Sequence, residues 1–255
     1  MNEQMNKQRL IVIGDTHGLA TWQQIVQAHP DASFVFLGDY CDPYTFYKIK
    51  DEQVIEQLEA IILFKKTNPD RVTLLLGNHD VHYFKKQSSE GSRYNVNLMH
   101  DLKNLYTVNE SLFQVAHQHG RLLFTHAGIS YPWFTQSFQG NLNLPIASQL
   151  QDRREDSSLF YCGAARGGLE LFGGIFWADK DELCQILPGF VQVVGHTRVP
   201  YIKVSHPHRE DKSAAVIYTD SLYEGNYLLI EKEVGGTFHY FEAHLDGSHA
   251  LELKV

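Results

Sequence analysis

The stretch FVFLGDYCDPY, residues 34–44, joins an apolar run to two carboxylates that stand three residues apart. The apolar residues before Gly38 predict a buried strand that breaks at the glycine. Asp39 and Asp42 are therefore expected at the mouth of a strand. The question is whether these two acids share one role or have two.

The same pattern recurs on both sides of this stretch. RLIVIGDTHG, residues 9–18, and RVTLLLGNHD, residues 71–80, are also apolar runs that break at a glycine followed by polar residues. Helices are predicted between the runs, over 21–29 and 51–70. The order β-α-β-α-β favours a parallel sheet covered by helices, in which ligands bind beyond the carboxyl ends of the strands. We expect the three breaks to lie close together.

The rest of the chain predicts further strands and one irregular segment. Residues 95–120 read as helical, and RLLFTHAG (121–128) and FVQVVGHTRV (190–199) read as a fourth and a fifth strand. Three antiparallel strands are expected in the tail because the gaps between them are too short for helical crossovers; they are AAVIYTD, NYLLIEKE and TFHYFEAHL.

No linker or repeat divides the chain, so one domain is predicted over 9–255. We expect residues 1–8 to be disordered and about 130–170, which show no steady period, to form a cap of loops and short helices.

Composition limits the function classes. The 255 residues carry a formal net charge of −8, which argues against nonspecific binding to nucleic acid or a membrane surface. The three cysteines form no CxxC, so a reducing compartment is expected. The first ten residues lack the apolar core of a signal peptide, and no apolar run approaches the roughly 18 residues of a membrane span. We expect a cytoplasmic protein.

Polar groups that bind metals follow all five strands. A single such residue would be read as a helix cap or a structural group, but five strand ends indicate one shared polar centre. Two divalent cations, about 3.5–4 Å apart and sharing a bridging carboxylate, would use this many ligands. Histidine and aspartate ligands suit Mn, Fe or Zn, and manganese is the first expectation in vitro. The residues are Asp15, His17, Asp39, Asp42, Asn78, His79, Asp80, His126 and His196.

The ordered motifs GDTHG, GDYCD, GNHD, THAG and GHT resemble those of the calcineurin-like metallophosphoesterase superfamily, from about residue 10 to residue 197. The resemblance implies an α/β fold, a β-sandwich of two mixed sheets flanked by helices (αββα), with a dimetal site at the strand ends. It implies that Asp15 and His17 bind one metal, that Asp39 bridges both, and that Asn78, His126 and His196 complete the second.

Within the superfamily the motifs point to two branches. GDYCD and GIFWAD (174–179) resemble segments of serine/threonine phosphoprotein phosphatases, and Arg198 stands where many phosphodiesterases carry a second histidine ligand. GNHDVHYF resembles instead the symmetrical bis(5'-nucleosyl)-tetraphosphatases, since Asp80 stands where protein phosphatases usually have Glu.

The resemblance also implies a mechanism. A metal-bridging hydroxide would attack phosphorus, His79 would donate a proton to the leaving oxygen, and Asp42 would hold the His79 imidazole. Pro43 departs from the family, because protein phosphatases place a phosphate-binding Arg directly after the second Asp. Arg166 is the first candidate to replace it. The other candidate phosphate contacts are Arg198, Arg93 and Asn78.

Several functions stay open on these grounds. Hydrolysis of a phosphate monoester, in a phosphoprotein or a small molecule, is the first hypothesis, and hydrolysis of a dinucleoside polyphosphate is the second. A nuclease is disfavoured by the acidic charge and the missing second histidine after His196. A metal-bound scaffold or binding protein without turnover is the alternative from another class. His82 matches no motif position and is expected to be structural or on the surface.

Overall fold

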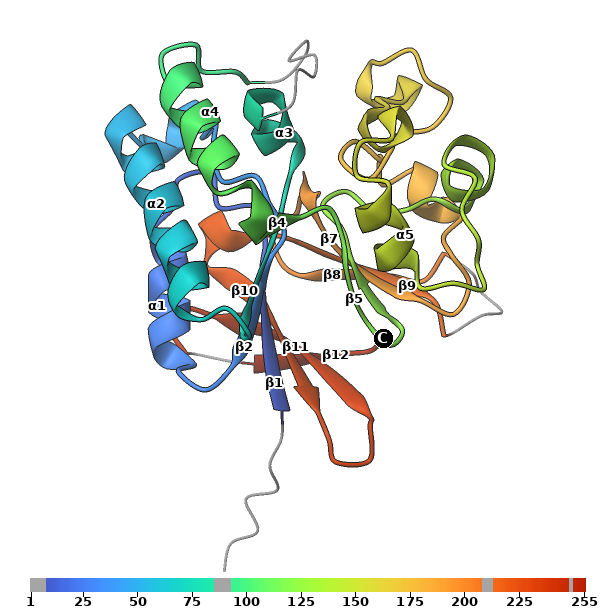
Figure 1. Ribbon diagram of the computed structural model, residues 1–255. Coiled ribbons are helices and arrows are strands. Elements are labelled where there is room, and N and C mark those ends of the chain that lie inside the picture. The colour runs from blue at the N-terminus through green and yellow to red at the C-terminus, as the bar shows by residue number, and fades with distance from the viewer. Residues whose placement is uncertain (1–7, 85–92, 208–212, 248–249) are drawn as a thin grey trace, which may run out of the picture.

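Two β-sheets stacked between helical layers make up the protein (Figure 1). The computed structural model describes residues 8–84, 93–207, 213–247 and 250–255. The expected sandwich of two mixed sheets flanked by helices is confirmed.

The larger sheet has the strand order β12-β11-β10-β1-β2-β3-β4. β1 to β4 run parallel to one another, and β10 joins β1 in the antiparallel direction with Leu10 opposite Ile230. Its strands are β1 (Gln8–Ile13), β2 (Ser33–Phe36), β3 (Val72–Leu75), β4 (Phe113–Gln114), β10 (Asn226–Lys232), β11 (Phe238–His244) and β12 (Ala250–Leu253).

The smaller sheet has the order β5-β6-β7-β9-β8. β6, β7 and β9 are parallel, and β5 and β8 pair antiparallel at the two edges. Its strands are β5 (His117–His119), β6 (Leu122–Phe124), β7 (Val191–Arg198), β8 (Lys203–Ser205) and β9 (Ala215–Asp220).

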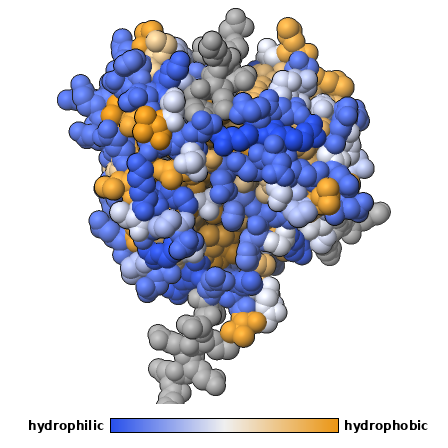
Figure 2. Space-filling view, viewed as in Figure 1, coloured by the Kyte–Doolittle hydropathy of each residue, from blue (hydrophilic) through white to orange (hydrophobic). Residues whose placement is uncertain are grey.

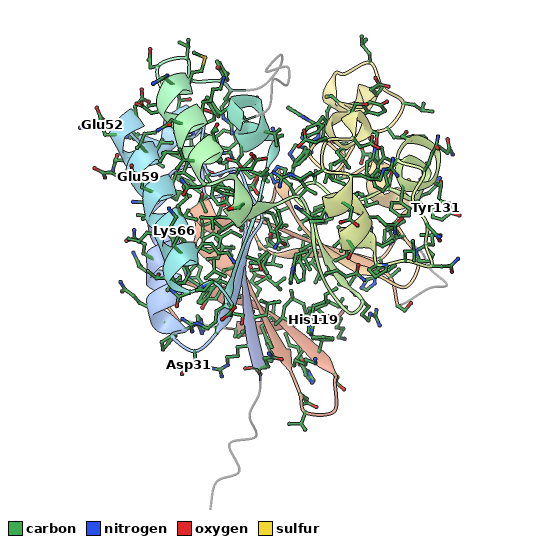
Figure 3. All side chains as sticks on the ribbon, viewed as in Figure 1. Asp31, Glu52, Glu59, Lys66, His119 and Tyr131 are labelled. Atoms are coloured by element: carbon green, nitrogen blue, oxygen red, sulfur yellow. The ribbon has the colours of Figure 1, made fainter. Side chains whose placement is uncertain are left out.

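The helices cover the outer faces of the sheets. α1, α2 and α4 lie on the side of the larger sheet and α5 on the side of the smaller one (Figure 1). Figure 3 shows Glu52, Glu59 and Lys66 pointing outward from α2, whereas Leu58 and Ile61 on its other face are fully buried. The helices are α1 (Thr21–Ala28), α2 (Asp51–Thr67), α3 (Asn78–Phe84), α4 (Met99–Val108) and α5 (Ile146–Asp152), with short helical turns at Thr45–Tyr47, Glu110–Leu112, Trp133–Ser137, Ser157–Phe160, Ala164–Arg166, Glu182–Cys184 and Leu222–Glu224.

Strand alternation explains why the chain stacks in layers. Successive side chains of a strand point to opposite faces, so an uninterrupted apolar strand can be buried on both. In β2, Phe34 and Phe36 pack in the core beneath the helices, while Val35 packs in the core between the sheets. In β7, Val193 joins the core between the sheets, and Val194 faces the segment that covers the smaller sheet. This double burial holds the ends of β2 and β7 in place.

Three sequence expectations need correction. Residues 95–120 are helical only in their first half, since α4 ends at Val108 and β4 and β5 follow. The three tail strands do not all pair with one another: β10 and β11 pair antiparallel in the larger sheet, whereas β9 lies in the smaller sheet, parallel to β7 and antiparallel to β8. The edge strands β8 and β12 and the short helix α3 were not expected.

The predictions about chain organisation are tested less directly. The expected disorder at 1–8 falls outside the described residues except at Gln8, which begins β1. Residues 130–165 contain short helices and loops, as expected, but the single domain and the capping role stay predictions.

Figure 2 shows hydrophilic side chains over most of the visible face, with apolar ones in small separate groups. Among the described residues, no helix combines the length and the apolar character needed to cross a membrane.

Candidate active site

The strand ends of both sheets meet at a cavity of about 270 Å³. It lies where β3 leads into α3, at one end of the stacked sheets (Figure 1). Its lining contains most of the residues that the sequence predicted, among them Arg93 and Arg166, together with two aromatic side chains. The lining residues are Asp15, His17, Asp39, Tyr44, Asn78, His79, Arg93, Arg166, Trp177 and His196.

Two groups of metal-binding side chains share one carboxylate. Ligand atoms of Asp15, His17 and Asp39 lie within 4.8 Å of one another, and so do those of Asp39, His126 and His196. Asp39 belongs to both groups, as a bridging ligand must. His126 is fully buried behind the cavity lining, which explains why it closes the second group without lining the cavity.

Asn78 stands inside the second group. Its side-chain oxygen is 2.9 Å from Nε2 of His126 and 2.8 Å from Nδ1 of His196. Nδ1 of His126 donates to the carbonyl of Leu37 at 2.8 Å, so Nε2 of the neutral ring carries a lone pair. Nε2 of His126 and the Asn78 oxygen are therefore both hydrogen-bond acceptors, and neither has a proton to donate to the other. A cation bound by both atoms would satisfy them.

The tautomer of His17 is fixed in the same way. Its Nδ1 lies 2.6 Å from the carbonyl of Cys41, which makes Nδ1 the donor and leaves Nε2 facing Asp39, at 3.8 Å from Oδ2. Metal-binding histidines commonly donate their other ring nitrogen to a backbone carbonyl. His196 adds a buried Nε2 without a hydrogen-bond partner among the described residues.

Electrostatics also match a cation site. Burial lowers the pKa of His17 to about 4 and lowers the pKa values of His126 and His196, so these rings are neutral and able to bind metal. Burial, with the nearby carboxylates of Asp220 and Asp39, raises the pKa of Asp15 well above its ordinary value. A cation would relieve this crowding of acids. The donor set therefore fits two metal ions.

Backbone geometry turns these side chains into the cavity. Six non-glycine residues among those described have positive φ, and four of them belong to the site: His17, Asp39, Asp42 and His196. Such conformations cost about 1–3 kcal/mol each and concentrate at functional sites. The sharp turn after each strand aims these side chains at a common point.

A second cluster lies beside the metal-binding groups. Nδ1 of His79 donates to Asp42 Oδ2 at 2.9 Å, and Nε2 of His82 approaches the same oxygen at 2.9 Å. The Tyr83 hydroxyl donates to the other oxygen of Asp42. Burial lowers the pKa of His79, but the carboxylates of Asp39 and Asp42 outweigh this effect and raise it above the ordinary value. His79 is therefore poised to hold a proton.

His82 and Tyr83 join this cluster although no motif position indicated them. His82 is buried and contacts Asp42, so it belongs to the interior of the protein and not to its surface. His79 and His82 are three residues apart and share one face of α3, but this spacing is a signal only where a helix is predicted, and the sequence predicts none here.

The three candidate arginines are placed differently. Arg93 lines the cavity, donates from Nε to the Asp42 carbonyl at 2.9 Å and lies 3.6 Å above the Tyr44 ring. Arg166 also lines the cavity, with Nε 2.8 Å from Asp179 and a terminal nitrogen donating to Thr197 at 2.9 Å. Arg198 does not line this cavity and pairs with Glu224 at 2.6 Å.

Asp80 supports the site from behind and belongs to neither of the two metal-binding groups. Its carboxylate accepts hydrogen bonds from the backbone N–H groups of Gly77, Asp39 and Tyr40 and from the Tyr106 hydroxyl. These contacts tie the turn after β2 to the turn after β3.

The fold and the site together define a hydrolase of the metallophosphoesterase class. The family model for calcineurin-like phosphoesterases matches residues 8–213, and the chain belongs to this family.

Solved structures share the fold at low identity. A protein serine/threonine phosphatase from Saccharomyces cerevisiae, with similarity to human phosphatase PP5, is 14% identical with a TM-score of 0.51, over 92% of this chain and 75% of that one. Purple acid phosphatase PPD1 from yellow lupin (Lupinus luteus) is 13% identical with a TM-score of 0.54, over 98% of this chain and 53% of its own. This chain therefore spans about half the length of the lupin protein.

Proposed function

We propose that this protein hydrolyses phosphate monoesters in a reaction that depends on two metal ions. The observation that carries the proposal is the pair of metal-binding groups that share Asp39, with His79 and Asp42 at their edge. Asp15 and His17 would hold one ion, and Asn78, His126 and His196 the other. When bound, the ions supply Lewis-acid stabilisation of the phosphoryl oxygens and activate water.

The protein's own side chains complete the reaction. Water adds to phosphorus and releases one proton to the solvent, the bond to the leaving oxygen breaks, and that oxygen takes a proton from His79. His79 then regains a proton from the solvent, so one water is consumed and no net proton is lost. Asp42 engages Nδ1 of His79, so Nε2 is the nitrogen that gives the proton. His82 and Tyr83 hold Asp42 in turn.

The phosphate would be held by the arginines that line the cavity. Arg93 and Arg166 both line it, and a guanidinium binds two phosphate oxygens at once. Arg198 lies further out and would meet only a longer substrate. The proposal includes phosphoproteins and small phosphate monoesters as candidate substrates. It takes manganese as the first expected metal, with iron and zinc as alternatives, and places the protein in the cytoplasm.

Substitution of His79 tests the proposal. Wild-type protein supplied with Mn²⁺ should hydrolyse phosphoserine and p-nitrophenyl phosphate and lose both activities on chelation. His79→Gln should lower kcat for phosphoserine by about 10²–10⁴-fold, because an alkoxide needs a proton, and lower it less for the nitrophenolate. Metal content, measured by atomic emission, should not change.

The outcomes separate the alternatives. Wild-type kcat in His79→Gln would refute its role as acid. Absence of hydrolysis across phosphomonoesters and diadenosine tetraphosphate, in metal-loaded protein, would favour a scaffold without turnover.

A further inference from the structure

Four aromatic rings form a continuous surface beside the cavity. We call Tyr44, Phe46, Tyr47 and Tyr223 the aromatic platform. Tyr44 lines the cavity with its ring centroid 5.4 Å from that of His17, and it stacks on Phe46 at 5.3 Å. Tyr47 and Tyr223 stack at 4.2 Å, and Tyr223 meets Phe46 edge-on at 5.5 Å. The rings therefore lead from a candidate metal ligand out to the surface.

The outer rings of the platform are the accessible ones. Phe46 is 47% exposed and Tyr223 is 44% exposed, whereas the guanidinium of Arg93 lies 3.6 Å over the Tyr44 ring. Exposed aromatic groups gathered beside a polar cavity mark a binding surface more often than scattered ones do. The more exposed ring surface thus begins one ring away from the cavity.

This spacing selects the shape of the leaving group. Because Tyr44 lines the cavity, we expect a ring bonded directly to the scissile phosphate to lie beside Tyr44. Phe46 and Tyr223 do not line the cavity, so we expect a ring to reach them only when it is carried on a sugar. The platform therefore suits a planar group separated from the reacting phosphate by a spacer.

Positive charge accompanies the rings. Arg93 lies at the inner edge, and the Arg198 guanidinium lies 4.9 Å from the Phe46 ring and 5.4 Å from the Tyr223 ring. Aromatic side chains joined with arginines are the surface on which nucleobases stack, and arginines also bind phosphate oxygens.

We propose that the aromatic platform is a leaving-group subsite for a nucleobase, and that the substrate is a nucleotide. This inference rests on the proposed function, because the scissile phosphate must lie in the cavity. A phosphorylated serine or threonine side chain offers no ring for Phe46 and Tyr223, so the platform favours nucleotides over phosphoproteins.

A pair of substrates that differ only in the base tests this inference. With Mn²⁺-loaded protein, kcat/KM for AMP should exceed that for ribose 5-phosphate by roughly 5- to 150-fold, the range that stacking of one base provides. Phe46→Ala should reduce this ratio several-fold by slowing AMP far more than ribose 5-phosphate. Tyr131→Ala, which removes an aromatic side chain of similar exposure (40%) elsewhere, should leave both values unchanged.

The possible outcomes separate failure of the nucleotide subsite from failure of the proposed phosphatase function. Equal kcat/KM for AMP and ribose 5-phosphate, equal losses on both in Phe46→Ala, or better turnover of a phosphoserine peptide than of AMP would each overturn the nucleotide subsite alone. So would hydrolysis of p-nitrophenyl phosphate with neither sugar phosphate consumed. Failure to hydrolyse any phosphoester would overturn the proposed function as well.

Discussion

At the scale of single residues, the most informative feature is Pro43, together with the arginine that approaches it from another segment of the chain. The turn after Asp42 carries a proline where the resembled phosphatases carry a phosphate-binding arginine. A guanidinium nevertheless reaches this place from another segment, because Arg93 donates to the carbonyl of Asp42 and covers the ring of Tyr44. One of its terminal nitrogens lies 3.3 Å from Nε2 of His17. Arg93 is thus placed to contact a phosphate bound between the two candidate metal groups.

Substitutions of Arg93 should separate the contribution of its positive charge from that of the paired hydrogen bonds of its guanidinium. Arg93→Ala should lower kcat/KM for phosphate monoesters by about 10–100-fold, since a charge-assisted hydrogen bond contributes about 1.5–3 kcal/mol. Arg93→Lys should restore only part of the loss, because an ammonium cannot make the paired contacts of a guanidinium. Steady-state kinetics with Arg153→Ala, which removes an arginine paired with Asp156, provides the control. An Arg93→Ala enzyme with unchanged kcat/KM would rule out this contact.

At the scale of elements, the sequence predicted the strands of the site well. Apolar runs that break at a glycine or at polar residues are local signals, so the ends of β1, β2, β3 and β6 could be read directly. The predicted metal ligands follow these ends except His196, which lies within β7, where the register with β9 shifts. Parallel pairing from β1 to β3 then brings their turns to one edge of a sheet, which is why Asp15, Asp39 and Asn78 meet.

The remaining features depend on contacts between distant segments. β9 lies beside β7 in the smaller sheet, whereas the following strand, β10, lies in the larger sheet, and no local pattern in 214–233 encodes that crossing. Arg93 reaches Asp42 across 51 residues of sequence. The contact of His82 with Asp42 needs α3, a helix too short for a clear apolar period.

Gly195 shows how an element sets the geometry of the site. A Cβ at this position of β7 would lie 2.1 Å from Oδ1 of Asp15, and the backbone N–H of His196 next to it donates to Asp15 at 3.0 Å. Only a residue without a side chain lets β7 come this close to the carboxylate.

Gly195→Ala should therefore weaken metal binding by displacing Asp15. We expect a rise of about 10-fold or more in the Mn²⁺ dissociation constant, as for the loss of a group that orients a ligand. Isothermal titration calorimetry measures this directly. Gly235→Ala, where a Cβ would meet nothing within 4 Å, should change the constant little. Equal affinities in the two variants would contradict the packing argument.

At the scale of the whole molecule, the site concentrates negative charge that the fold alone leaves uncompensated. Asp15, Asp39 and Asp220 are buried on three strand ends from both sheets. Burial and the nearby Asp39 carboxylate raise the pKa of Asp220 to about 7, and its Oδ2 has no hydrogen-bond partner among the described residues. Metal ions at this place would join the two sheets as well as serve the reaction.

Metal removal should therefore lower the stability of the protein. A ligand that binds only the folded state, at 100 times its dissociation constant, stabilises it by about 2.7 kcal/mol. In a chain of this size each kcal/mol shifts Tm by about 2–4 °C, so chelation should lower Tm by roughly 5–11 °C and added Mn²⁺ should restore it. Differential scanning calorimetry measures the shift. Asp39→Asn replaces the shared carboxylate with an amide, so its Tm should hardly respond to Mn²⁺ or to chelator. A wild-type Tm that is the same with and without Mn²⁺ would show that the buried carboxylates need no cation, and a full Mn²⁺ response in Asp39→Asn would show that Asp39 is not shared between the ions.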